Sequence, residues 1–285
     1  MKKVILCSDR TCDLNEELIK ATGVHLVPYH ITLDGKEYSD NVDITTEDIY
    51  KAYWDKKILP KTSALNIGDL TDFWKPFIDD GCEVVHINLG SAITSTYRNC
   101  LLAAGDLNGV YVVDSQNLST GSGHLVLEAA RMIDEGMCAA DIAKALNELA
   151  PTVHSSFVLD TLEFMAAGGR CSTVAALGAN LLKLKPSVIV DSSAGGAMKV
   201  AKKYRGDFAK VLPQYVKDML GAYDNIRTDK IFITFTAVEQ RYIDIVTQTV
   251  KETLDFDKIY YTEASCTIGC HCGPNCIGIL FMTEK

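Results

Sequence analysis

The sequence predicts a two-lobed α/β protein: an N-terminal parallel sheet between helices, and a C-terminal mixed sheet backed by helices. Three observations carry this prediction. The 285 residues exceed what one small domain usually contains. Apolar strand-like runs alternate with helical stretches in the first half, and the order of elements becomes irregular in the second half. We expect the domains to be residues 1–153 and 154–285, with a seam near Pro151.

The first strand is expected at residues 4–7, followed by an amphipathic helix at 15–22. A second apolar run covers residues 24–31. Residues 44–48 open the next helix, because their hydroxyls can cap it and their acids complement its N-terminal dipole. Lys61, Thr62 and Ser63 are then expected in a loop.

Two βα units follow. The first has a strand at residues 84–88 and a helix at 97–107, and the second has a strand at 110–114 and a helix at 124–135. Continuous apolar strands of this kind are typical of a parallel sheet covered on both faces. The first 150 residues therefore predict three or four βα units.

The second half contains shorter and less regular elements. Apolar spacing at Ile245, Val246, Val250 and Leu254 indicates a helix at residues 241–254. The other expected elements are strands at 157–159, 188–190, 198–200, 231–235 and 259–261 and helices at 162–166 and 174–182. This irregular order favours a mixed sheet.

The charge balance argues against nucleic acid as a partner. Lys and Arg number 28 and Asp and Glu number 37, which gives a net charge of −9 and no basic excess for phosphates. No window resembles a transmembrane helix, and the apolar run after Lys3 is too short for a signal sequence. We therefore expect a cytoplasmic protein whose ten cysteines are reduced thiols.

The strongest local motif is the hydroxyl-rich stretch 88–97, where a parallel strand should lead into a helix. Ser91, Thr94 and Ser95 lie there beside Gly90. At the carboxyl edge of a parallel sheet, the free amides of a helix N-terminus attract a carboxylate or phosphate. The alternative is that Thr94 or Ser95 only caps the helix.

Other hydroxyls lie near predicted strand or loop ends. Thr62 and Ser63 form one pair, and Ser115 follows Asp114. A βα architecture gathers such ends along one rim, so together they favour a binding site. Taken singly, each is more often a turn residue that bonds its own backbone.

His271 lies in an apparent Gly/Pro turn and is surrounded by cysteines. An imidazole held there can bind a carboxylate, act as a base or bind metal. The C-x₃-C-x-C-x₃-C spacing matches neither a zinc knuckle nor a ferredoxin motif, which favours free thiols over a metal site. The four cysteines are Cys266, Cys270, Cys272 and Cys276.

Arg170 follows Gly168 and Gly169, which are expected to end a helix. The arginine is then either a simple C-terminal cation or a contact for a partner or anion. The sequence contains no G-x-G-x-x-G after a strand, no G-x₄-G-K-[ST] and no G-x-S-x-G. Nucleotide-binding and α/β-hydrolase signatures are therefore missing.

These motifs occur in an order that resembles the DegV family of bacterial fatty-acid-binding proteins over nearly the whole chain. The motifs that carry the resemblance are Ser8-Asp9, Thr62-Ser63, the loop from Gly90 to Tyr97, Val113-Asp114-Ser115, Leu162-Glu163-Phe164 through Gly168-Gly169-Arg170, Leu184-Lys185-Pro186, and His271-Cys272-Gly273-Pro274.

The resemblance implies that a long-chain fatty acid binds between the two lobes. It assigns the carboxylate to Thr62, Thr94, the amide of Ser95 and His271, with Ser63 and Ser91 close by. It also implies delivery of the acid to an ATP-dependent fatty acid kinase for phospholipid synthesis, and it assigns Arg170 to the kinase-facing surface. No cofactor and no metal are expected.

The chain departs from the family pattern at four positions. Leu65 replaces a proline, Thr94 a serine, and Ser95 and Asn275 replace glycines. The methyl group of Thr94 and the side chain of Ser95 narrow the space around a headgroup. Asn275 can adopt the positive φ that the glycine would supply.

Two functions of different classes follow from these residues. The first is a carrier without chemistry of its own. The second is an enzyme in which His271 activates Ser91 or Thr94 toward an acyl group, or in which the cysteine cluster performs redox or metal chemistry. Fatty acid extracted from the purified protein would favour the carrier.

Overall fold

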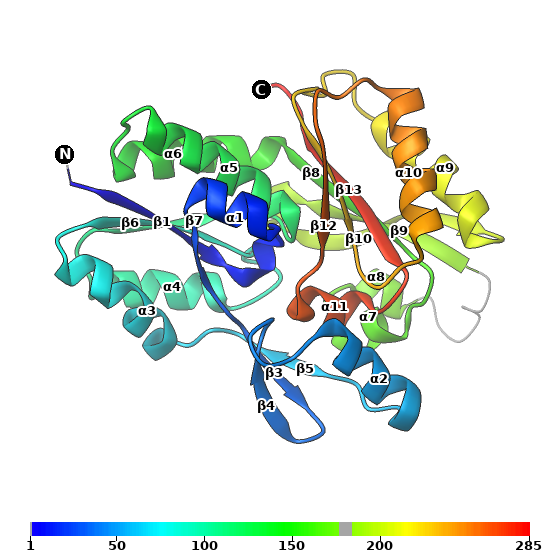
Figure 1. Cartoon of the computed structure of the whole chain (residues 1–285), viewed down its shortest axis with the longest axis horizontal. Helices are drawn as coiled ribbons and strands as arrows, with labels where there is room; N and C mark the ends of the chain where they lie inside the picture. Colours follow the sequence, from blue (N-terminus) through cyan, green and yellow to red (C-terminus); the bar gives the residue numbers. More distant parts are fainter. Residues whose placement is uncertain (1, 177–183) are drawn as a thin grey trace.

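The structure, a computed structural model, describes residues 2–176 and 184–285. It confirms the predicted α/β class, with a parallel sheet in the N-terminal part and a mixed sheet in the C-terminal part (Figure 1). The predicted domain boundary at 153/154 stays a prediction. In the structure, the strand that enters the C-terminal sheet begins at Val153.

The N-terminal sheet has the order β2-β1-β6-β7, and its neighbouring strands are all parallel. Helices α3 and α4 contact one face, and α5 and α6 contact the other (Figure 1). Both faces are therefore covered, as the apolar runs predict. The strands are β1 (Val4–Asp9), β2 (His25–Val27), β6 (Glu83–Asn88) and β7 (Val110–Asp114).

The helices of this half have recognisable starts. Thr45 and Asp48 form a capping box at α2, and Asn66 and Asp69 form another at α3. Helices α3 and α6 are not predicted from the sequence. The helices are α1 (Glu16–Thr22), α2 (Thr46–Lys56), α3 (Ile67–Asp79), α4 (Thr96–Gly105), α5 (Thr120–Asp134) and α6 (Ala139–Leu149).

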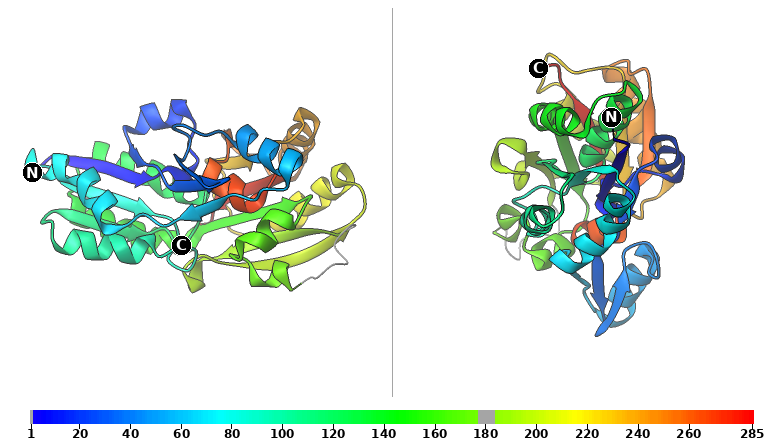
Figure 2. Two further views of the ribbon diagram at one scale, coloured as in Figure 1. Left: turned by 90° about the horizontal axis from the view of Figure 1, so that it is seen from below. Right: turned by 90° about the vertical axis from the view of Figure 1, so that its left-hand side faces the viewer.

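A small antiparallel sheet, which the sequence does not predict, projects with α2 from the rest of the molecule (Figure 2). Its order is β4-β3-β5, formed by His30–Leu33 (β3), Lys36–Ser39 (β4) and Lys61–Ser63 (β5). The expected loop at 61–63 is therefore wrong, because these residues pair with β3. The single run predicted at 24–31 splits into β2 and β3 around Pro28, which has no N–H for a ladder.

The C-terminal sheet has the order β10-β9-β8-β13-β11-β12. All neighbours are antiparallel except β11 and β12. Strand β13 is last in sequence but lies between β8 and β11 (Figure 1). The strands are β8 (Val153–Leu159), β9 (Leu184–Asp191), β10 (Ala197–Arg205), β11 (Ile231–Phe235), β12 (Ile259–Glu263) and β13 (Cys276–Met282).

The helices of the second half flank this sheet. Helices α9 and α10 contact its strands on one side, and α11 lies near α7, α2 and β5. Helices α9 and α11 are not predicted from the sequence. The helices are α7 (Glu163–Gly168), α8 (Ser172–Ala175), α9 (Phe208–Leu220), α10 (Gln240–Thr253) and α11 (Cys266–Cys272). Of the helix expected at 174–182, residues 177–182 lie outside the described residues.

Helix α5 begins four residues before its expected start at His124. The glycines at 121 and 123 suggest a turn, but they allow close packing instead. A Cβ at Gly121 would overlap the side chains of Asn117 and Ser155, and one at Gly123 would overlap Leu14. The turn expected at 115–123 therefore ends at Ser119.

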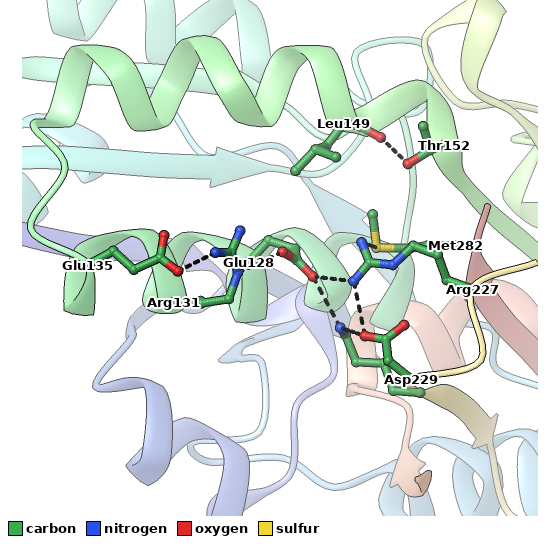
Figure 3. Close-up of polar contacts among 9 residues, drawn as sticks. Glu128, Arg131, Glu135, Leu149, Thr152, Arg227, Asp229 and Met282 are labelled. Atoms are coloured by element: carbon green, nitrogen blue, oxygen red, sulfur yellow. Dashed lines mark hydrogen bonds and ion pairs between the residues drawn. The ribbon is translucent and has the colours of Figure 1, made fainter. Parts of the chain in front are cut away.

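A network of charged side chains joins the two halves on one side of the molecule (Figure 3). Glu128 of α5 is 4% exposed and accepts hydrogen bonds from Arg227 and Lys230 at 3.1 Å each. Asp229 bonds the same two cations. Burial opposes the charge of Glu128, but Lys230 and Arg227 outweigh it and lower the pKa of Glu128. We call these four residues the ion network.

Helix α5 also packs against the C-terminal sheet through His124. This fully buried ring bonds the carbonyl of Leu280 at 3.0 Å through Nε2. Burial lowers the pKa of His124 to about 4, so the ring is neutral at pH 7.

In the part of the chain that the structure describes, no helix is long and apolar enough to cross a membrane.

Candidate functional site

A cavity of about 580 Å³ is bounded by residues of both halves. All six residues predicted to surround a carboxylate lie on its wall: Thr62, Ser63, Ser91, Thr94, Ser95 and His271. Arg170 also reaches the cavity. Much of the remaining wall is apolar, formed by Leu89, Ile93, Leu118, Met165, Met198 and Ile268.

The hydroxyl loop, residues 90–95, connects β6 to α4 and is fixed by bonds to both halves. Gly90 donates its amide to Asn117, and Ala92 donates its amide to the carbonyl of Gly195 at 3.0 Å. A Cβ at Gly90 would lie 2.7 Å from that same carbonyl oxygen. A glycine is therefore needed at residue 90, since any side chain would push the two halves apart.

The N-terminus of α4 adjoins the cavity, because Thr94 and Ser95 both line it. Ser95 is the N-cap residue, but its side chain makes no capping bond. Thr94 Oγ1 accepts a 3.3 Å bond from the amide of Thr96, so Thr94 has a local structural role as well. The first turn of α4 carries no acid, so nothing in that turn neutralises the positive end of the helix dipole.

Thr62 and His271 meet in this wall although 209 positions separate them. The Oγ1 of Thr62 lies 2.8 Å from Nε2 of His271. Burial, followed by the nearby charge of Arg170, lowers the pKa of His271 to about 4. The imidazole is therefore neutral at pH 7 and binds Thr62 by an ordinary hydrogen bond.

His271 is held close to the end of α7. A Cβ at Gly168 would overlap Nδ1 of His271, so the ring can lie there only because residue 168 is glycine. This Nδ1 is buried and has no hydrogen-bond partner among residues 2–176 and 184–285. The predicted helix end is confirmed, since Gly169 adopts a φ of 68° as the C-cap.

His271 does not lie in a turn, as the Gly/Pro pattern suggests, but in the last turn of α11. The helix forms because distant residues satisfy its first amides. Asp13 accepts the amide of Ser265 at 2.9 Å, and Asn41 accepts the amide of Cys266 at 2.8 Å. Gly273, with a φ of 71°, then ends the helix. Asn275 adopts the expected positive φ, at 54°.

Two lining residues carry a formal charge, Arg98 and Arg170, and both are exposed arginines. Arg170 donates to the carbonyl of Gly168 at 2.6 Å, as a cation at a helix C-terminus can. No acidic residue is part of the described cavity wall. An incoming anion therefore meets no carboxylate on the described wall itself.

Several wall residues are not predicted from the sequence. Tyr29 lies between β2 and β3, and Met198 lies on β10, far from any hydroxyl motif. Neither has a local pattern that distinguishes it from a core residue. Tyr29 is 2% exposed and donates its hydroxyl to Asp9 at 3.2 Å.

A second cavity of about 30 Å³ lies against the C-terminal sheet. Its wall includes Phe157, Gly278 and Leu280 from strands β8 and β13. The two cavities share Leu118, Ile268 and Cys272, so these three side chains stand between them.

All ten cysteines are free in the structure. Burial raises the pKa of Cys266 to about 12 and raises that of Cys270 well above its usual range. Buried thiols of this kind are poor nucleophiles because the thiolate is disfavoured. Within residues 2–176 and 184–285, no three His, Cys, Asp or Glu side chains are grouped to hold a metal ion.

Comparison with known proteins gives a consistent result. The family model for the DegV family of uncharacterised proteins matches residues 3–284. A DegV domain-containing protein of Caldanaerobacter subterraneus is 29% identical over 283 residues, which cover 99% of each chain.

Solved structures share the fold over the full length. A fatty-acid-binding DegV family protein from Thermus thermophilus has a TM-score of 0.86 and 25% identity, and all of both chains is covered. A stearic-acid-binding protein from Eubacterium ventriosum has a TM-score of 0.84 and 23% identity, with 99% of this chain and 98% of that one covered. With the family model matching residues 3–284, the chain belongs to the DegV family.

Proposed function

We propose that this protein binds a long-chain fatty acid in the 580 Å³ cavity. The observation that carries the proposal is one cavity whose wall combines several uncharged hydroxyls with several apolar side chains. The fatty acid binding described for the protein from Thermus thermophilus, which has the same fold, supports it. The carboxylate lies among Thr62, Ser63, Ser91, Thr94, Ser95 and His271.

The headgroup is held by neutral donors rather than by a buried cation. With Nε2 of His271 donating to Thr62, the Thr62 hydroxyl is free to donate to the carboxylate. The N-terminus of α4 adds the favourable end of its dipole. Hydrogen bonds to an ionised acceptor are stronger than neutral ones, so a few donors can compensate for lost hydration.

The acyl chain lies on the apolar part of the wall, directed toward Leu118, Ile268 and Cys272. A sixteen-carbon acid has about fourteen methylenes, and burial of each contributes roughly 0.8 kcal/mol. The gain is on the order of 11 kcal/mol before the costs of association. Apolar burial therefore dominates affinity, and the hydroxyls select for the acid.

The direct test is to denature the protein purified from cells and to identify extracted lipids by mass spectrometry. We expect about one long-chain fatty acid per chain. Purified protein that contains no fatty acid and binds none when it is added would contradict the proposal.

A substitution then tests the headgroup. Thr62→Val keeps the shape of the side chain but removes its hydroxyl, and we expect a 5- to 100-fold weaker affinity, equivalent to about 1–3 kcal/mol. Thr253→Val is the control, because it removes a hydroxyl bonded only to its own helix, α10, away from the cavity. Equal affinities for the two variants would place the carboxylate elsewhere.

We further propose that the protein is a cytoplasmic carrier, needs no cofactor and presents the carboxylate to an ATP-dependent kinase that forms an acyl phosphate for phospholipid synthesis. The exposed Arg170 at the cavity supports a partner contact there. The alternative of an acyl-directed or thiol enzyme has less support. His271 bonds Thr62 rather than Ser91 or Thr94, and the pKa values of Cys266 and Cys270 are raised.

A further inference from the structure

Asp9, the last residue of β1, is a buried carboxylate that the binding site described above does not use. It is 1% exposed, although a carboxylate is rarely buried without several partners. Strand β1 lies beside β6, whose end leads into the hydroxyl loop (Figure 1). Asp9 is therefore directly behind the wall of the cavity rather than on it.

Four donors converge on this carboxylate, three of them from residues 86–89 and the fourth from Tyr29. Its Oδ2 accepts the amide of Leu89 at 2.7 Å and the hydroxyl of Tyr29 at 3.2 Å. Its Oδ1 accepts Nε2 of His86 at 3.2 Å and the side-chain amide of Asn88 at 3.3 Å. Two of these donors, Leu89 and Tyr29, belong to residues that line the cavity.

The histidine in this group has a defined tautomer. Trp74 donates its indole N–H to Nδ1 of His86 at 3.1 Å, and an indole nitrogen can only donate. Nδ1 is therefore the acceptor, so the proton of the neutral ring is on Nε2 and points at Asp9. Trp74 and His86 are both completely buried, which fixes this orientation in the core.

Tyr29 extends the group to the headgroup donors. Its hydroxyl bonds Asp9 and lies near the hydroxyls of Thr94 and Thr96. The Oγ1 atoms of Thr94 and Thr96 are 3.1 Å apart, and that of Thr96 also accepts the amide of Leu65, which lies two residues after β5. A series of polar contacts therefore leads from Asp9 through Tyr29 to Thr94 and Thr96.

We propose that Asp9 is the positioning residue of the carboxylate site. It fixes Leu89 at the start of the hydroxyl loop and Tyr29 in the cavity wall without touching the ligand. An asparagine cannot replace it, because one of its two terminal atoms would be an NH₂ group facing donors. This inference rests on the proposed fatty acid binding and adds how the headgroup donors are oriented.

The test compares a fatty acid with the fatty alcohol of the same chain length, because only the headgroups differ. In Asp9→Asn we expect the ratio of acid affinity to alcohol affinity to fall at least tenfold. Tyr29→Phe, which removes one donor to Asp9, should lower the ratio about three- to tenfold. If Asp9→Asn does not fold, Tyr29→Phe decides the matter.

Asp69→Asn is the matched control. Like Asp9, Asp69 bonds a backbone amide, that of Asn66 at 2.9 Å, and a histidine ring, Nε2 of His30 at 3.0 Å. Neither Asn66 nor His30 lines the cavity. The ratio of acid affinity to alcohol affinity in Asp69→Asn should equal that of the wild type. An unchanged ratio in folded Asp9→Asn or Tyr29→Phe would overturn the inference, whereas failure of the wild type to bind the acid would overturn the proposed function.

Discussion

Two of the junctions between the halves of this protein use polar groups in opposite ways. The cavity wall brings Thr62, Thr94 and a neutral His271 together and leaves about 580 Å³ between the halves. At the ion network, the negatively charged Glu128 is in direct contact with the positively charged Arg227 (Figure 3). One junction leaves room for an incoming charge, and the other satisfies its charges internally.

The difference shows what a site needs if it is to bind an anion and release it again. A buried fixed cation would need a counterion whenever the ligand is absent, since an unpaired buried charge is costly. Hydroxyls and a neutral imidazole can be hydrogen-bonded to one another or to water in either state. The permanent junction has no empty state, so paired charges are suitable there.

The largest expected effect is on the permanent junction. Glu128→Gln leaves Arg227 and Lys230 with only Asp229 as an acidic partner, so we expect a loss of roughly 3 kcal/mol in the free energy of unfolding. Urea denaturation measures it. Asp79→Asn is the control, because its pair with Lys75 is more than half exposed, lies outside this network and should contribute less than about 0.5 kcal/mol. Equal losses would contradict the distinction between the two junctions.

The next effect is a pH dependence at the same junction. The pKa of His124 is about 4 in the folded protein and near 6.5 when unfolded, so its contribution to stability is lost as the pH falls from 6.5 toward 4. His124→Phe removes this titration. We expect the stability gap between wild type and variant to narrow by about 2 kcal/mol from pH 7 to pH 4.5. Asp13, with a pKa raised by burial to about 7, acts oppositely but equally in both proteins. A constant gap would contradict this prediction.

A smaller effect separates binding from stability at neighbouring glycines. Gly168→Ala places a methyl group against His271, so we expect about tenfold weaker fatty acid affinity, or roughly 1.4 kcal/mol. Gly169→Ala meets no atom but strains a φ of 68°, so it should lower stability by about 1 kcal/mol and leave affinity unchanged. Titration calorimetry and thermal melts measure the two. Unaltered affinity in Gly168→Ala would show that the ring need not lie against Thr62.

The smallest effect on the protein itself is expected at Arg170. Its guanidinium is exposed, so Arg170→Ala should change stability by less than about 0.5 kcal/mol and affinity by less than about threefold. If a kinase binds here, acyl phosphate formation should fall at least tenfold, since a truncated interface arginine commonly costs over about 1.4 kcal/mol. The assay needs the purified cognate kinase. An unchanged rate would make Arg170 an ordinary surface cation.

The sequence predicts the parallel half well because its signals are local. The apolar run at β6 is almost fully buried and that at β7 is half-buried, and each leads into a helix through polar residues. The small β4-β3-β5 sheet is missed because β4 is short, polar and mostly exposed, which gives no alternation to read. Helix α11 is missed because its stability comes from Asp13 and Asn41, more than 200 positions away.

For the candidate site, the order of motifs shared with the family indicates segments that do line the cavity. Thr62, Thr94 and His271 do line one cavity, although their roles stay predictions. The sequence could not identify Tyr29 or the group around Asp9, since their contacts depend on tertiary packing of β1, β6 and α3. In a sequence, a tyrosine that lines a binding site cannot be told from a core tyrosine, because the partner of its hydroxyl is known only from the fold.

The central position of β13 has a consequence for the order of folding. This strand follows the other five in sequence, yet β8 and β11 are joined only through it. A growing chain that has reached residue 275 would present two unpaired strand edges, which are prone to pair with other chains. Pairing across such sequence distances is also slow. The part of the cavity wall that α11 forms can therefore assemble only after α11 has been synthesised. Nascent chains then depend on rapid insertion of β13 between β8 and β11 to avoid aggregation.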